Sequence, residues 1–484
     1  MSLRPALVTF VLVGASLARG ALAAPETKAM TKEALAAAEV KALLPLLRSA
    51  VKEDYRRQAW YVATRVLVGE PKNPEAEAAL KSFQGKELEE GRDPAKPWLA
   101  TRDATFRKLG DLYAQFVRET QAAGGAAVDT FAYLERAMAY GTVAADALAA
   151  MESAGYGWHG TYGSVKKGLV ETALGAAAAA TGFPPEYDDA VLRHRCIWPD
   201  ARVVEFGKTR LVSALSPDDT WRMVAVLTAE EALFVRTFGS KARDPAKDED
   251  DHTDVVVVPD ATLYGRLGDA FVPQDMRADF DRASSWYMPY RRRLFVVAPV
   301  RDNPWTSRDA TICGEAVRPM IRRHLGAGTG SWLHGRGSWI LDGFVGAFEG
   351  FVSKAPGEGE IDPARCWRLA AVRELFDRAA FISWADLFEM DRKQADDVAT
   401  RELEFTWGGE ARKAKGLAVP SLQATALVMA IWQPDTGKGV KRLAALIEEL
   451  YKRNRLPDLD KALGLSNGKT VELVEAYIKA LSTK

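Results

Sequence analysis

The sequence predicts an α+β fold that is mostly helical, with one small mixed sheet between two helical regions. Two observations predict it. Apolar residues recur at helical spacing over residues 31–150, as in Val40, Leu43 and Leu47. Beyond residue 190 the pattern changes to short β-branched runs, and after residue 307 helical spacing returns and continues to the C-terminus.

The first 24 residues have the order of a secretory signal peptide. Arg4 is followed by an apolar run over residues 6–18 and by the small-residue site Ala21-Leu22-Ala23. We therefore expect export to a periplasm or to the extracellular space. The apolar run is too short to span a bilayer, which takes roughly 20 apolar residues, and no later stretch approaches that length. Since Cys196, Cys313 and Cys366 are all far from the cleavage site, we expect no lipid anchor.

Composition limits the classes of protein that the chain can belong to. The 65 basic and 65 acidic residues give a formal net charge of zero, which argues against nucleic acid as the main partner because phosphate binding needs a concentrated positive field. Three cysteines leave at least one unpaired, so the fold does not depend on a framework of disulfides. With 484 residues, of which 48% are hydrophobic, we expect two or three domains with apolar cores.

The N-terminal region, residues 25–150, is predicted to be a helical domain. Residues 55–83, with a turn at Pro71-Lys72-Asn73-Pro74, have the form of one helix-turn-helix unit of a tetratricopeptide-type array. Because no period of about 34 residues repeats through the region, an irregular helical domain is the simpler interpretation. Residues 151–195 contain repeated glycines and the Gly182-Phe183-Pro184-Pro185 break, and are predicted to form a linker or a small β element.

Strands are predicted at residues 202–206, 221–227, 254–258 and 294–298, with a helix at 229–238. The uninterrupted valines of 255–258 indicate a strand that is covered on both faces. Arg291-Arg292-Arg293 ahead of the last strand predicts a more exposed position for it.

Two helical segments carry the residues that point to a function. The first, Gly314-Glu315-Ala316-Val317-Arg318, follows the last predicted strand, and the second reads Trp339-Ile340-Leu341-Asp342-Gly343-Phe344. Their order resembles that of gluzincin zinc peptidases, in which a strand precedes a His-Glu-x-x-His helix and the next helix reads Trp-x-x-Glu-Gly-Phe. From about residue 200 onward the chain is similar to exported bacterial peptidase-MA-like proteins. The resemblance implies a zincin-like domain at 196–355, with 356–484 as its helical C-terminal region.

Both histidine positions of that motif hold other residues. In these peptidases two imidazoles one helical turn apart bind zinc, a carboxylate from the next helix completes the ligands, and the motif glutamate activates water. Glu315 takes the general-base position and Asp342 the third-ligand position, whereas Gly314 has no donor atom and Arg318 is a permanent cation. We therefore expect no catalytic zinc and no other cofactor, with Arg318 paired to Glu315 or Asp342. Pro319 predicts a bend in this helix.

Other residues near the motif are candidates to replace the missing ligands or to act as a nucleophile. His324 and His334, with Asp342, are a possible relocated zinc site, but His324 lies well away from the motif face, and a solvated histidine at a helix end is the simpler interpretation. Cys313 is expected to be an inert helix cysteine rather than a nucleophile. Trp339, Ile340, Phe344 and Phe348 are expected in the core, although aromatic residues near the cleft, Trp339 and Phe344 among them, remain candidates for contacting a peptide beside Arg318 and Asp342.

Three functions are consistent with the sequence. The first is an exported, catalytically inactive metallopeptidase-like protein that binds or scaffolds an unknown protein or peptide, through the cleft, the N-terminal helices or both. The second is a hydrolase with a non-standard site around Glu315 and Asp342, which would use zinc. The third is a structural helical-repeat interaction protein that the degenerate domain supports. Metal content separates the second function from the other two.

Overall fold

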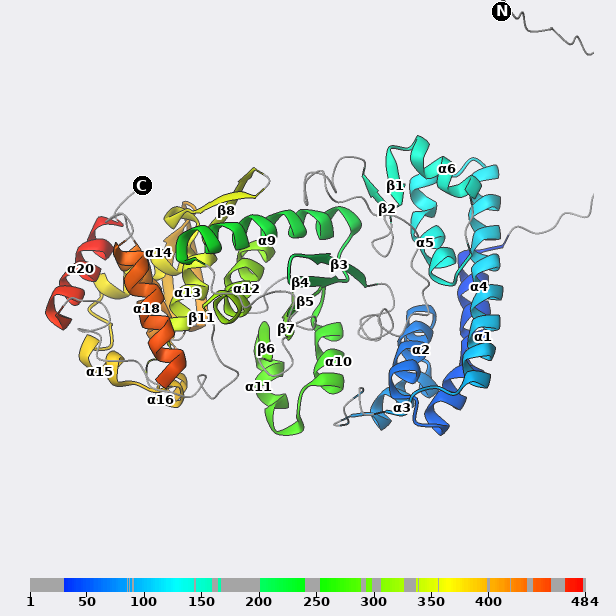
Figure 1. The fold of residues 1–484 in the computed structure, drawn as a ribbon, viewed down its shortest axis with the longest axis horizontal. Helices are drawn as coiled ribbons and strands as arrows, with labels where there is room; N and C mark the ends of the chain where they lie inside the picture. The colour runs from blue at the N-terminus through cyan, green and yellow to red at the C-terminus, as the bar shows by residue number, and fades with distance from the viewer. Residues whose placement is uncertain are drawn as a thin grey trace, which may run out of the picture.

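The computed structural model describes residues 30–84, 86, 88, 91–142, 145–158, 164–166, 201–239, 253–288, 293–297, 306–325, 337, 339–355, 357–397, 401–417, 419–432, 438–453 and 466–481. It has a mostly helical α+β fold (Figure 1), as the sequence predicts. The predicted signal peptide, most of the predicted linker at 151–195, Cys196 and His334 lie outside the described residues.

The N-terminal helices form a layer of their own at one end of the molecule (Figure 1), with an apolar core drawn from residues 35–151. They are α1 (Lys32–Lys52), α2 (Arg56–Gly69), α3 (Pro74–Ser82), α4 (Lys96–Ala122), α5 (Phe131–Ala139) and α6 (Ala145–Ser153). The predicted helix-turn-helix at 55–83 is confirmed. Asn73 caps α3 by accepting hydrogen bonds from the backbone N–H groups of Glu75 and Ala76. Pro74 is the first residue of the helix, where its lack of an N–H costs no helical hydrogen bond. The short strands β1 (Tyr156–Trp158) and β2 (Ser164–Lys166) follow as an antiparallel pair.

A five-stranded mixed sheet lies between the two helical regions. Its strand order is β3 (Arg202–Phe206), β4 (Thr209–Ser213), β5 (Thr253–Val258), β7 (Arg293–Val297) and β6 (Ser285–Met288). The central pairs β4–β5 and β5–β7 are parallel, and both edge pairs are antiparallel. Because side chains alternate along a strand, Val255 and Val257 pack with α9 (Pro217–Phe238) and α12 (Arg308–His324), whereas Val256 and Val258 pack with α10 (Ala261–Phe271) and α11 (Arg277–Arg282). The prediction of a doubly covered strand at 255–258 is confirmed.

Two predictions about this sheet are wrong. Residues 221–227 form part of α9 rather than a strand, because Ser216 caps the helix at the Asp219 N–H and Pro217 starts it. The strand that begins at Arg293, β7, is an inner strand and is not exposed. The Arg293 side chain is buried because it pairs with Asp254 at 3.2 Å, and the Phe271 ring lies 4.8 Å from its guanidinium. β6 pairs with β7 on its outer side and forms the edge of the sheet.

The C-terminal half is a helical assembly that contains two β-hairpins. Its helices are α12, α13 (Ile340–Phe348), α14 (Trp367–Asp377), α15 (Trp384–Glu389), α16 (Arg392–Asp397), α17 (Val419–Trp432), α18 (Lys438–Arg453) and α20 (Asn467–Ala480). The hairpins are β8 (Phe351–Ala355) with β9 (Glu358–Ile361), and β10 (Arg401–Trp407) with β11 (Glu410–Leu417). The prediction of unbroken helical structure after residue 307 is therefore wrong. Gly408 and Gly409, both at positive φ, make the tight β10–β11 turn.

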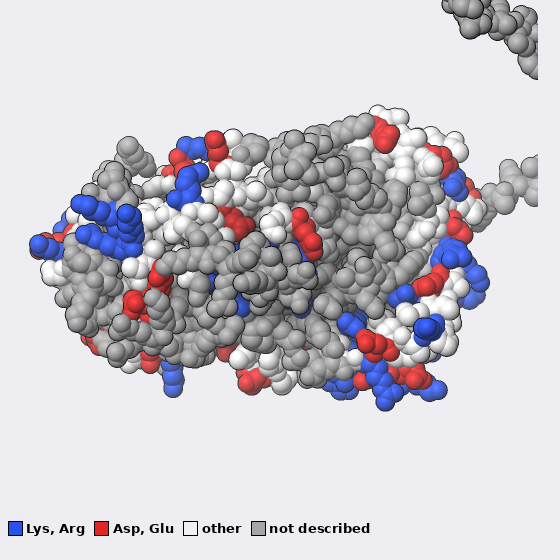
Figure 2. Space-filling model, viewed as in Figure 1, with Lys and Arg blue, Asp and Glu red and all other residues white. Residues whose placement is uncertain are grey.

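Charges of both signs are interspersed over the N-terminal helices on the face shown in Figure 2, whereas basic side chains gather at the opposite end near α18 and α20. Exposed lysines on those two helices include Lys438, Lys441 and Lys469. Among the described helices, none is both long and apolar enough to cross a membrane.

Candidate functional site

The candidate site is built on the packing of α12 against α13. Ser307 caps α12 by accepting a hydrogen bond from the Ala310 N–H, and the helix continues through Pro319 to His324. The two helices approach closely at Gly314. A Cβ atom there would lie 2.8 Å from the carbonyl oxygen of Val345 and 2.8 Å from Cγ of Glu349. Position 314 therefore has no room for a side chain in this packing.

The guanidinium of Arg318 joins the two carboxylates that the sequence singled out. Its Nε donates to Oε2 of Glu315 at 2.9 Å, and its Nη2 donates to Oδ1 of Asp342 at 2.7 Å. All three side chains are only 14–16% exposed. Burial alone would lower the pKa of Arg318, but the two carboxylates raise it further above its ordinary value. The structure therefore brings Glu315, Arg318 and Asp342 together as an ion-paired cluster, with Arg318 bonded to both acids rather than to one.

A second buried pair adjoins this cluster. Glu349 and Arg368 form two parallel hydrogen bonds of 2.9 and 2.8 Å, and Arg368 also donates to Oγ of Ser421 at 2.9 Å. Burial raises the pKa of Glu349, Arg368 lowers it, and the charge of Glu315 raises it again, so the two pairs interact electrostatically. Sequence reasoning missed Glu349. The usable signal was its spacing of seven residues after Asp342, which places both on one side of a continuing helix.

Trp339 and Phe344, which the sequence predicts in the core and also offers as peptide contacts, are fully buried. Trp339 stacks on Phe388 with ring centroids 6.2 Å apart, and Phe344 packs against Phe238 at 5.7 Å. Of the candidate binding residues, only Arg318 and Asp342 retain some exposure. The structure thus places both aromatic rings in the core, where they position α13.

His324 is buried, and the interpretation of it as a solvated helix-end residue is wrong. Its Nε2 lies 2.8 Å from Oε1 of Glu231 on α9, the same oxygen that accepts from Nη1 of Arg323 at 2.6 Å. Burial acts to raise the pKa of Glu231, but His324 and Arg323 hold it below its ordinary value. His324 is therefore tied to a different acid from Glu315 and Asp342. Within the described ranges, no three His, Cys, Asp or Glu side chains are arranged to hold a metal ion.

The two described cysteines are buried and unpaired with each other. Burial raises the pKa of Cys366 to about 12, and its thiol donates to the carbonyl of Gly346 at 3.0 Å. Burial also raises the pKa of Cys313 well above its ordinary value, and the nearby carboxyl of Glu230 adds to that effect. Because the thiolate is the nucleophile, neither thiol has the character of a reactive cysteine.

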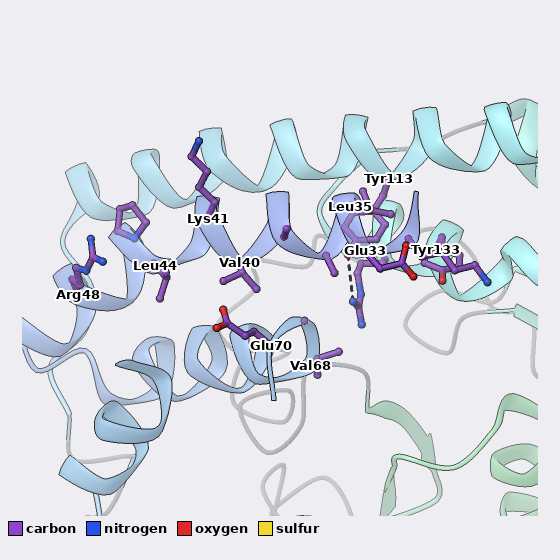
Figure 3. Close-up of a pocket in the computed structure, with 16 residues that line it drawn as sticks. Glu33, Leu35, Val40, Lys41, Leu44, Arg48, Val68, Glu70, Tyr113 and Tyr133 are labelled. Atoms are coloured by element: carbon purple, nitrogen blue, oxygen red, sulfur yellow. Dashed lines mark hydrogen bonds between the residues drawn. The ribbon is translucent and has the colours of Figure 1, made fainter. Parts of the chain in front are cut away.

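A second candidate region is a groove of about 800 Å³ along α1 (Figure 3), in the N-terminal helices that the sequence analysis offers as a binding surface. Small and apolar side chains, among them Ala37, Val40 and Leu44, line its length. At one end Tyr113 and Tyr133 lie near each other, as Figure 3 shows, and Lys32 sits 5.7 Å from the Tyr133 ring. The signal in the sequence was the group of short side chains at Ala36, Ala37 and Val40 of α1, which leaves space that longer residues would fill.

No protein-family model matches the chain, and no curated protein sequence is detectably similar to it.

Proposed function

We propose that this chain is an exported, catalytically inactive metallopeptidase-like protein that acts as a binding or scaffolding module. The observation that carries the proposal is the double hydrogen bond of Arg318 to Glu315 and Asp342. In a working site those two acids would serve a metal and its water. Here a guanidinium, which does not deprotonate in proteins, engages both.

The packing at Gly314 supports the same conclusion. A metal-binding side chain at this position would meet the Val345 carbonyl oxygen, which belongs to the backbone and cannot rotate away. Glu315 is also poorly placed as a general base, because its Oε2 already accepts a hydrogen bond from the permanently charged Arg318. These features favour loss of catalysis over a hydrolase with a rearranged site.

Two regions offer surface for a partner. One is the partly exposed acid–arginine cluster, and the other is the groove along α1, whose mixture of apolar and charged side chains suits a peptide segment. If neither region binds a peptide, the remaining function is a structural helical array.

The experiment is selection of peptides from a displayed random library on the full chain from residue 25, followed by fluorescence anisotropy of the selected peptides. Ala37→Arg fills the groove, and Asp342→Asn changes the cluster while leaving the groove intact. We expect saturable binding that one variant weakens at least tenfold and the other leaves unchanged. Selected peptides that bind this protein no more tightly than they bind serum albumin would contradict the proposal.

A further inference from the structure

Glu230 is a fully buried carboxyl group in the middle of α9. Ala229 and Leu233, its neighbours on α9, pack with Cys313 and Phe351 in a small apolar cluster. Neither carboxylate oxygen has a hydrogen bond of normal geometry to any part of the chain that the structure describes. The polar group that faces it from α12 is the Cys313 thiol, which is only a weak donor. A carboxylate in such a place is costly unless it is neutral.

The charged groups around Glu230 are engaged elsewhere. On its own helix, Glu231 is bonded to Arg323 and His324 of α12, and Arg236 donates to the carbonyl oxygen of Gly359 on β9. The hairpin β8–β9 presents Phe351 and Ile361 to this cluster, both apolar. Among the described residues, no cation forms an ion pair with Glu230.

We propose that Glu230 makes the contact between α9 and α12 sensitive to pH. Protonated Glu230 keeps the contact closed, and loss of its proton places an unpaired charge against Cys313 and Phe351 and opens it. Cys313, the α12 side of this contact, directly precedes Gly314, so opening of the contact loosens the helix that carries Glu315 and Arg318. This inference does not depend on the proposed function, since it concerns packing rather than metal or partner binding.

The direction of the pH effect follows from the ionisation of the carboxyl group. Burial raises the pKa of Glu230 well above its ordinary value of 4.5, Cys313 lowers it, and the charge of Glu231 raises it again. Above pH 4.5 an open or unfolded chain has released the proton, while the closed chain keeps it. The closed contact is therefore most stable below that pH and is lost as pH rises toward the folded pKa. The opening constant rises by up to about tenfold per pH unit over that interval.

Alkylation of Cys313 by iodoacetamide reports the opening directly. The folded full chain is labelled briefly between pH 6 and 9, and peptide mass spectrometry gives the labelling rate of Cys313 relative to Cys366. Cys366 is also buried but lies against Gly346 rather than Glu230, so the ratio removes the ordinary effect of pH on thiol reactivity. Three variants accompany the wild type: Glu230→Gln, the apolar Glu230→Met, and Glu205→Gln, which removes an exposed carboxyl as a control.

We expect the Cys313 ratio to rise by up to about tenfold per pH unit in the wild type and in Glu205→Gln. In Glu230→Gln it should not change with pH. If glutamine disturbs folding, Glu230→Met supplies the same comparison without a charge or a new amide. A ratio that is independent of pH in the wild type, or that rises equally in a folded Glu230 variant, would overturn the inference.

Discussion

Replacing Arg318 with methionine is expected to lower the free energy of unfolding by about 3 kcal/mol, because breaking a buried ion pair leaves an uncompensated charge. Methionine keeps much of the volume but removes the guanidinium that bonds to Glu315 and Asp342. Both carboxylates would then remain largely buried, close to the negative charge of Glu349. Urea unfolding of the folded chain at pH 7, followed by circular dichroism, measures the difference.

The matched control is Arg222→Met. Arg222 also pairs with an acid, Asp219 at 2.9 Å, but its side chain is 53% exposed. Exposed pairs contribute little, so this variant should lose at most about 1 kcal/mol. Equal losses in the two variants would show that the Arg318 cluster behaves as an ordinary surface pair and would contradict the description of it as a buried ion-paired cluster.

The second large effect is expected for Gly343→Ala, with a loss of about 3 kcal/mol from overpacking. A Cβ atom at Gly343 would lie 2.5 Å from the carbonyl oxygen of Ala424 on α17, and 2.9 Å from Cγ2 of Val428. Since the nearer atom belongs to the backbone, the helices must separate to admit the methyl group. Thermal or urea unfolding of the variant measures the loss.

Gly468→Ala is the control for this substitution. Gly468 lies in α20, where a Cβ atom would meet nothing within 4 Å, so alanine should be neutral or slightly stabilising. A Gly343→Ala protein that is as stable as Gly468→Ala would mean that α13 and α17 are not in the close contact described.

Local patterns predicted the parts of the fold that depend on neighbours in sequence. The turn at Asn73-Pro74 and the valine run 255–258 each carry their own signal, and both are found. Trp221–Leu227 was misassigned because its β-branched and aromatic residues resemble a strand, whereas the cap at Ser216 sets a helix. The β10–β11 hairpin was missed although Leu403 and Phe405, separated by Glu404, are buried in the alternation that is typical of a half-buried strand.

The candidate site was predictable only in part, for a related reason. Arg318 and Glu315 are three residues apart on one helix, so their pairing follows from helical spacing. Asp342 was predicted to lie beside them because of the resemblance to gluzincin peptidases, and helical spacing alone would not have placed it there. The partners of His324 and Arg368 could not be found, because Glu231 and Ser421 are distant in sequence and only the folded chain brings them close.

The most direct test of the account is the zinc content of the purified chain from residue 25 after a zinc soak and removal of free metal, measured by mass spectrometry of the element. Wild type, Glu315→Ala and Asp342→Ala are compared, since a true zincin site needs the third-ligand carboxylate far more than the general base. We predict no stoichiometric zinc in any of the three proteins, because Arg318 engages both acids. Stoichiometric zinc in the wild type that is retained in Glu315→Ala and lost in Asp342→Ala would contradict the inactive assignment.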